Sequence, residues 1–108
     1  MRMKWYKELY VGDIAREKKH IMIGKIRFRR FQKDAYLITL SSNGNNLLDI
    51  YPSYVLLQKV YRNQELFVVG LACGYDEALE VTRRVVDDVY QNTGGFDVKG
   101  FVLGKSTF

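Results

Sequence analysis

The sequence predicts one small α/β domain, in which helices alternate with the strands of a mainly parallel sheet. The first observation is a short apolar run at residues 66–71, which is β-branched at its centre and typical of a strand covered on both faces. The second is residues 76–92, where apolar side chains recur every three or four positions, as on one face of an amphipathic helix. A strand followed by a helix of this length predicts a βαβ unit, and therefore a parallel sheet.

Length and composition predict that residues 1–108 form a single domain. A chain of 108 residues with 47% hydrophobic residues is long enough for one core and too short for two. One cysteine excludes an internal disulfide, and one histidine leaves too few ligands for a zinc site, so we expect no metal and a reducing, cytoplasmic location. The chain has neither an apolar run of the ~20 residues that a membrane helix needs nor the apolar segment of a secretory signal, so no membrane partner is expected.

The basic N-terminal part is expected to contain a helix. Residues 5–11 form an apolar cluster, and Asp13 can cap the segment that follows it. The apolar spacing of residues 13–30 predicts the helix, although Gly24 costs about 1 kcal/mol relative to alanine. Residues 25–29 also alternate with period two, so an edge strand is the alternative there.

The middle of the chain predicts a strand, a polar loop and a helix. Residues 35–40 are apolar and partly β-branched, which is typical of a strand. The loop at 41–46 contains an Asn-Gly pair, the strongest short signal for a β-hairpin. The segment after this loop runs directly into Pro52, which a central strand excludes. We therefore expect a helix at 53–62, and an antiparallel hairpin over 35–51 is the alternative.

The C-terminal part is expected to supply the last strand. The helix at 76–92 ends before Gly94, a suitable C-cap, and residues 97–103 alternate loosely between apolar and polar. The complete prediction is a three-stranded, mainly parallel sheet in α-β-α-β-α-β order, with strands at 35–40, 66–71 and 97–103 and helices at 13–30, 53–62 and 76–92 packed on it. The predicted core residues are Tyr36, Ile38, Leu40, Leu57, Val60, Phe67, Val69, Leu71, Val81, Val85 and Val89.

A parallel sheet would bring two polar loops together at one edge. Open α/β sheets bind ligands at the carboxyl ends of their strands, where loops 41–46 and 72–76 would both lie. The alternative is that these are ordinary connecting loops. The candidate residues for binding a small polar ligand, or for catalysis on it, are Ser41, Ser42, Asn43, Asn45, Cys73 and Tyr75.

The chemistry expected at this edge is limited. Residues 70–74 match neither GxGxxG nor GxxxxGK(S/T), and the acidic pair that follows would repel phosphate, so no nucleotide or other cofactor is expected. Cys73 precedes a helix N-terminus, where a thiol can become nucleophilic. Because the only histidine is His20, far away in the sequence, a small space-filling residue is the simpler interpretation of this cysteine.

Positive charge is concentrated at the N-terminus. Residues 1–33 hold eleven Lys/Arg and three acids, for +8, whereas residues 34–108 hold six and nine, for −3. Cations interleaved with Phe28 and Phe31 suit the phosphates and bases of a nucleic acid, and a solvated helix face is the alternative. About four of these cations could contact phosphates at once, because a helix spreads its side chains around its axis. The candidates for polyanion binding are Arg16, Lys18, Lys19, Lys25, Arg27, Arg29, Arg30 and Lys33.

Three phrases, DAYLITL, NLLDIYPSYVLLQ and LFVVGLACGYDEALEVTRRVVDDVYQNTGGFDV, resemble a family of small uncharacterised bacterial proteins. The resemblance covers most of the chain. It implies a self-contained bacterial domain, and it transfers no functional residue because no activity is established for that family.

The aromatic content predicts an interaction surface. Eight Tyr, six Phe and one Trp exceed what so small a core can hold, and aromatic side chains with a polar end suit interfaces. A three-stranded sheet also leaves two edges that a partner chain can cover. We therefore expect first a non-enzymatic interaction module that associates with itself as a homodimer or higher oligomer. Weak nucleic-acid binding through the basic segment, and small-ligand binding or catalysis at the loops, are the alternatives.

Overall fold

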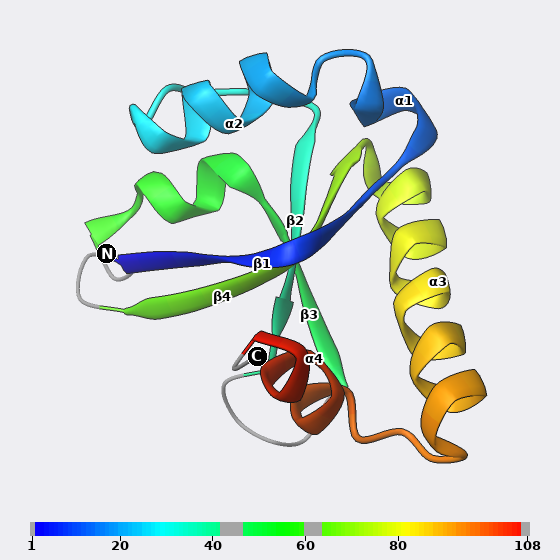
Figure 1. The fold of residues 1–108 in the computed structure, drawn as a ribbon. Helices are drawn as coiled ribbons and strands as arrows, with labels where there is room; N and C mark the ends of the chain where they lie inside the picture. Colours follow the sequence, from blue (N-terminus) through cyan, green and yellow to red (C-terminus); the bar gives the residue numbers. More distant parts are fainter. Residues whose placement is uncertain (1, 42–46, 60–63, 107–108) are drawn as a thin grey trace.

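The computed structural model describes residues 2–41, 47–59 and 64–106, which form a sheet between two layers of helices. Figure 1 shows α1 and α2 together on one side of the sheet, and α3 and α4 on the other. In this described part of the chain, no helix is both long enough and apolar enough to cross a membrane. In chain order the elements are β1 (Arg2–Val11), α1 (Asp13–Arg16), α2 (Lys19–Arg27), β2 (Ala35–Leu40), β3 (Leu48–Pro52), the 3₁₀ helix η1 (Ser53–Leu57), β4 (Glu65–Cys73), α3 (Tyr75–Thr93) and α4 (Val98–Ser106).

The sheet is four-stranded and mixed, so the prediction of a three-stranded, mainly parallel sheet is wrong. The strand order is β1-β4-β2-β3. Only β1 and β4 run parallel, whereas β2 is antiparallel to both of its neighbours. The α/β class holds, but the predicted order of alternating helices and strands does not.

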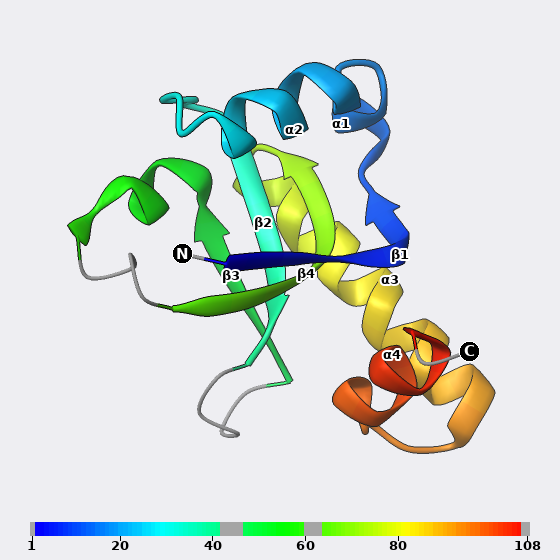
Figure 2. The same ribbon diagram turned by 60° about the vertical axis from the view of Figure 1, so that its left-hand side comes forward.

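The largest correction is the hairpin of β2 and β3, which the sequence offered as the alternative. The two strands pair from Leu40 opposite Leu48 to Tyr36 opposite Pro52. Figure 2 shows β3 returning alongside β2 to η1. Pro52 is tolerated because β3 is the outer strand of the sheet, where one side of the backbone needs no ladder partner. The connecting residues 42–46 lie outside the described residues.

The N-terminal apolar cluster is the edge strand β1. Its side chains alternate between the two faces of the sheet: Trp5 and Leu9 pack on the side of α2, whereas Tyr6 and Tyr10 pack on the side of α3 and α4. Both faces of this strand are therefore covered, although it pairs with β4 alone. The pairing is interrupted between Trp5 and Tyr10, where the register shifts.

The predicted helix at 13–30 is two short helices, because the chain turns at residues 17–18 between α1 and α2. The predicted helix at 53–62 is the 3₁₀ helix η1, which ends at Leu57, and residues 60–62 lie outside the described part.

The predicted strand at 97–103 is wrong, because this segment is the helix α4. Val98 and Val102 are four positions apart and both fully buried against α3 and β1, so a helical stripe replaces the expected alternation. The Asp97 carboxylate accepts a hydrogen bond from the backbone N–H of Gly100 at 3.0 Å and caps this helix.

The central strand and the long helix confirm the strongest sequence patterns. β4 and α3 cover the predicted ranges, and α3 ends at Gly94, which has the left-handed conformation of a C-cap with φ of 75°. The predicted core residues fully buried in the structure are Ile38, Val69, Leu71, Val81, Val85 and Val89, whereas Tyr36, Leu40, Leu57 and Phe67 are half-buried and Val60 lies outside the described residues.

Gly70 allows α3 to approach the sheet closely. It lies in β4 at a bulge, where the pairing with β2 shifts by one residue. A methyl group added there would lie 2.8 Å from Val81 Cγ1 and 3.3 Å from Ile38 Cβ, and both of these side chains are fully buried. The strand and the helix can therefore sit at this separation only with glycine between them.

We expect Gly70→Ala to lower the free energy of unfolding by about 1–3 kcal/mol, because the added methyl overpacks the core. Urea unfolding followed by circular dichroism measures this change. Gly24→Ala is the control, since a Cβ there meets no atom within 4 Å and a helix gains up to about 1 kcal/mol from the exchange. Equal midpoints for Gly70→Ala and the unsubstituted protein would contradict the close approach.

Candidate functional site

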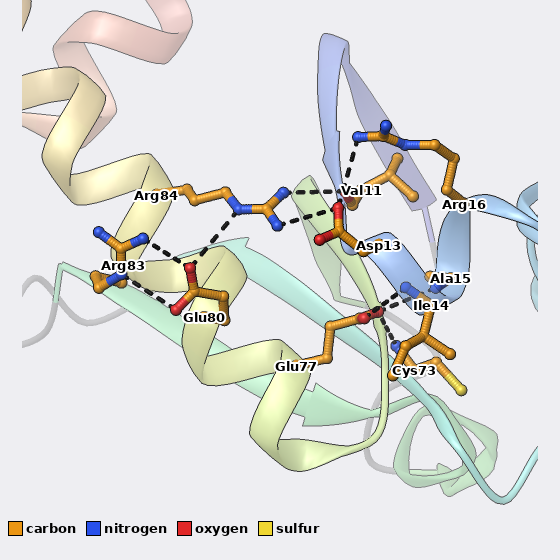
Figure 3. A network of polar contacts seen from close by, with 10 residues as sticks. All are labelled: Val11, Asp13, Ile14, Ala15, Arg16, Cys73, Glu77, Glu80, Arg83 and Arg84. Carbon is orange, nitrogen blue, oxygen red and sulfur yellow. Dashed lines mark hydrogen bonds and ion pairs between the residues drawn. The ribbon is translucent and has the colours of Figure 1, made fainter.

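A polar network joins α3 to α1, and its centre is Glu77 (Figure 3). The Glu77 carboxylate accepts hydrogen bonds from the backbone N–H groups of Ile14 at 2.7 Å, Ala15 at 3.0 Å and Cys73 at 2.9 Å. The N-cap of α1 is Gly12, which has no side chain to bond these groups, so α3 supplies the cap from outside. A Cβ on Gly12 would overlap the Glu77 carboxylate.

The rest of this network consists of ion pairs. Arg84 lies 3.3 Å from the Asp13 carboxylate and also donates to the Val11 carbonyl at 3.4 Å. Arg83 pairs with Glu80 at 2.6 Å, and this hydrogen bond lowers the pKa of the Glu80 carboxyl and raises the pKa of the Arg83 guanidinium. The carboxylates are occupied by backbone or guanidinium donors. The network therefore holds α1 and the end of β1 on α3, and does not form an acid–base couple.

The structure separates the residues expected at the carboxyl edge. Cys73 pairs with Ala35 at the start of β2, whereas Ser41 follows the end of that strand, about 20 Å away. Tyr75 is exposed and packs edge-on against Tyr36 with ring centroids 6.0 Å apart. The premise of a shared edge is wrong because β2 is antiparallel to β4. Ser42, Asn43 and Asn45 lie outside the described residues.

The predicted polyanion-binding cations lie on two sides of α2 and do not form one face. Three of them, Lys18, Lys25 and Lys33, line a hollow of about 360 Å³ together with Cys73. Arg27 and Arg29 line another hollow, of about 260 Å³, against β1. Arg16 is on α1, 4.0 Å from Asp13, Lys19 is half-buried in the first turn of α2, and Arg30 is exposed beyond its end.

Two aromatic side chains stand out from the surface among these cations. Phe28 is 79% exposed, and Phe31 is 65% exposed although its ring contacts that of Tyr54, with centroids 5.6 Å apart. Phe28 lies between Arg27 and Arg29 in the chain, and Phe31 lines the same hollow as Lys18, Lys25 and Lys33. Single exposed apolar residues are common, but exposed rings next to cations match the stacking groups and charges of a single-stranded nucleic-acid surface.

The outer side of α3 carries a surface that the sequence prediction missed. A hollow of about 510 Å³ opens there, and Leu79, Tyr90 and Phe96 beside it are 47%, 49% and 53% exposed. Phe96 stacks on Tyr90 with centroids 5.3 Å apart. The signal was present in Leu79 and Tyr90, which extend the apolar face of α3 beyond the buried stripe. This surface, which we call the outer α3 face, consists of Leu79, Thr82, Arg83, Val86, Asp87, Tyr90 and Phe96.

On the opposite side of α3, Tyr10 of β1 donates a hydrogen bond to the Asp88 carboxylate at 2.6 Å. Burial, then this bond and the negative charge of Asp88, raise the pKa of the Tyr10 phenol. Burial and the neighbouring Glu8 raise the pKa of Tyr6 in the same direction. A folded-state pKa above the unfolded value means that the protonated phenol contributes stability below pH ~10, which is lost as the pH rises further.

We therefore expect stability to fall above pH ~10, and Tyr10→Phe to fall less steeply because it lacks the ionising phenol. Urea midpoints measured at pH 8, 10 and 11 for both proteins give the difference due to Tyr10. Parallel declines of the two proteins would show that the hydrogen bond to Asp88 has no part in the alkaline loss.

Among residues 2–41, 47–59 and 64–106, no three His, Cys, Asp or Glu side chains gather where they could hold a metal ion. Comparison of the chain with protein-family models, curated proteins and solved structures finds no match. The resemblance to small bacterial proteins therefore stays a prediction.

Proposed function

We propose that this chain is a non-enzymatic interaction module of the bacterial cytoplasm that associates with a second copy through the outer α3 face. The observation that carries the proposal is the hollow on this face, with its three half-exposed apolar side chains Leu79, Tyr90 and Phe96. Aromatic rings with a polar end are enriched at protein interfaces. The single cysteine and the resemblance to bacterial proteins support the location.

Charge complementarity favours a second copy as the occupant. Arg83 and Asp87 line the hollow near the middle of α3. If two α3 helices pack antiparallel about a two-fold axis between residues 84 and 85, Leu79 faces Tyr90 of the second copy and Arg83 lies beside its Asp87. The axis generates each contact twice. A parallel arrangement would instead place Arg83 against Arg83, which disfavours it.

The size of the surface predicts a weak dimer. A half-exposed large side chain offers on the order of 100 Å², so the three apolar residues supply a fraction of the ~800 Å² that each partner buries in a standard interface. We expect a Kd in the range of about 1–100 μM, set mainly by apolar burial, since surface ion pairs contribute little.

Sedimentation velocity from about 1 to 200 μM protein tests this proposal. The expected result is a sedimentation coefficient that rises with concentration from the monomer value towards the dimer value. A monomer at every concentration would overturn it. Because apolar contacts dominate, raising the salt from 0.1 to 0.5 M should weaken the dimer only slightly.

A second candidate function, weak binding of single-stranded nucleic acid, is favoured by the exposure of Phe28 and Phe31 beside Arg27, Arg29 and Arg30. We expect binding without sequence preference and a slope of log affinity against log salt of about −3 to −4, for about four phosphates contacted. Fluorescence anisotropy with a labelled oligothymidylate gives this slope.

A matched pair of triple variants controls this second proposal. Arg27→Gln, Arg29→Gln and Arg30→Gln together should flatten the slope, because they remove three phosphate contacts. Lys7→Gln, Lys59→Gln and Lys99→Gln together change the net charge equally but line neither of the two hollows beside α2, and should alter the slope much less. No binding at ~20 μM protein in low salt, or equal effects of the two triple variants, would contradict the site.

A further inference from the structure

We propose that the hollow between α2 and the start of β2 binds a small organic anion, a carboxylate or phosphate carried on an apolar body. The hollow has a volume of about 360 Å³, in the lower range of small-molecule sites. It is separate from the outer α3 face, so the proposal does not depend on dimerisation. Its lining residues are Lys18, Ile21, Met22, Lys25, Phe31, Gln32, Lys33, Asp34, Ala35 and Cys73.

The charge around the hollow selects an anion. Lys18 precedes α2 and Lys25 lies two helical turns later on the same side of that helix, while Lys33 comes from the segment that leads into β2. Asp34 is the one carboxylate among the lining residues, which leaves an excess of two positive charges. None of the three lysines forms an ion pair in the described part of the chain, so their ammonium groups are available to a ligand.

The apolar lining selects the body of the ligand. Met22 and Ala35 are buried and belong to the core beneath α2, whereas Ile21 and Phe31 are exposed. Gln32 is held by a hydrogen bond from its side-chain amide to the Met22 carbonyl at 3.0 Å. An inorganic anion could meet the lysines but would leave this apolar lining uncovered. An aromatic or aliphatic anion satisfies both, as in most small-molecule sites.

Cys73 makes the occupancy of the hollow measurable. It is the one cysteine of the chain and lines this hollow at the end of β4, so any thiol modification reports on this place. The residue is half-buried and its backbone N–H is held by Glu77. The thiol has no chemical role in the proposed binding, which depends on the cavity and its three lysines.

The experiment measures the rate at which the neutral reagent 4,4′-dithiodipyridine modifies Cys73, with and without phenyl phosphate at ~5 mM. We expect phenyl phosphate to slow the reaction about fivefold, while phenol and inorganic phosphate at the same concentration slow it less than twofold, since each offers one half of the recognised chemistry. Amide shifts of Ala35 and Cys73 in ¹⁵N spectra provide a measure of binding that does not depend on thiol reactivity.

Charge-neutral variants separate this site from a general effect of positive charge. Lys18→Gln with Lys25→Gln should weaken phenyl phosphate binding about fivefold, whereas Lys7→Gln with Lys59→Gln should leave it unchanged. Equal protection by phenol and phenyl phosphate would overturn the role of charge. Equal binding by the two double variants, or amide shifts confined to residues away from Ala35 and Cys73, would overturn the site itself.

Discussion

Leu79→Arg is expected to raise the Kd for self-association by about 100-fold, to about 0.1–10 mM. In the proposed antiparallel pairing, Leu79 packs against Tyr90 of the second copy, so the two-fold axis places two guanidinium groups in apolar contacts. Sedimentation velocity at ~100 μM should then give a coefficient shifted from the value of the unsubstituted protein towards that of the monomer. Because Leu79 is 47% exposed in the isolated chain, the fold should survive the substitution.

Leu47 provides a matched control for this variant. It is the same residue type with the same 47% exposure, but it lies before β3 and away from the outer α3 face. Leu47→Arg should leave the dimer intact. If both leucine variants dissociate to the same extent, or neither does, the outer α3 face is not the interface.

A charge exchange within α3 tests the antiparallel register. Arg83→Asp alone brings acidic groups together at both symmetry-related contacts and should weaken the dimer. Adding Asp87→Arg restores an opposite-charge pair across the axis, so the double variant should recover most of the affinity. Because Arg83 and Asp87 also interact within one helix, urea midpoints of the same variants separate a change in helix stability from a change in association.

Glu77→Ala is expected to lower the free energy of unfolding by about 2–3 kcal/mol. The substitution leaves the backbone N–H groups of Ile14, Ala15 and Cys73 without their acceptor, and those of Ala15 and Cys73 are partly buried. It also detaches α1 from α3, so hydrogen exchange in residues 12–16 should accelerate more than exchange in the core strands. Urea unfolding gives the change in the free energy of unfolding, and hydrogen exchange measured on the same samples gives the local change in residues 12–16.

Glu80→Ala is the control for this loss of stability. Glu80 lies one helical turn after Glu77 but pairs with the exposed Arg83 at 2.6 Å and with the half-buried Arg84 only at 3.9 Å, so its removal should cost less than about 0.5 kcal/mol. Equal destabilisation by the two substitutions would contradict the capping role of Glu77. Glu77→Gln should lie between the two, since its one carbonyl oxygen retains part of the hydrogen bonding.

The parts of the fold that could be predicted are those whose pattern is long and local. α3 is nineteen residues long and combines a buried stripe from Ala78 to Val89 with a glycine at its C-cap, and most of β4 is a continuous apolar run. The short helices lack such signals. After the end of α2, Arg29 has the left-handed conformation, with φ of 56°. Glycine is the usual residue in this conformation after a helix, so the sequence gives no signal that α2 ends here.

The pairing of the strands could not be predicted because it depends on contacts far apart in the sequence. The side chains of β1 alternate between the two faces of the sheet, and in the sequence they form only an apolar cluster. This segment is a strand because it pairs with β4, which lies about sixty residues later in the chain. Pro52 argued against a hairpin only on the assumption that β3 was central. Once β3 is the outer strand, the Asn-Gly signal and the proline agree.

For the candidate sites too, the sequence indicated residue types correctly but not which distant residues lie together. The sequence identified the cations and Cys73, but it assigned Cys73 to a loop edge shared with Ser41. The structure places Cys73 beside Lys18, Lys25 and Lys33 instead, because β2 begins where β4 ends. The outer α3 face was visible only in part, since Phe96 reaches Tyr90 through the turn at Gly94.

Distances between spin labels in the dimer test the proposed pairing of α3 most directly. Single labels at Asp76→Cys or Gln91→Cys, each in a Cys73→Ser background, lie in α3 outside the outer α3 face. An antiparallel pair centred between residues 84 and 85 offsets the two labels along the helix axis by about 25 Å for position 76 and about 20 Å for position 91. Dipolar spectroscopy at ~100 μM should therefore give long distances at both positions. Short distances at both positions, or no dipolar coupling at all, would contradict self-association through antiparallel α3 helices.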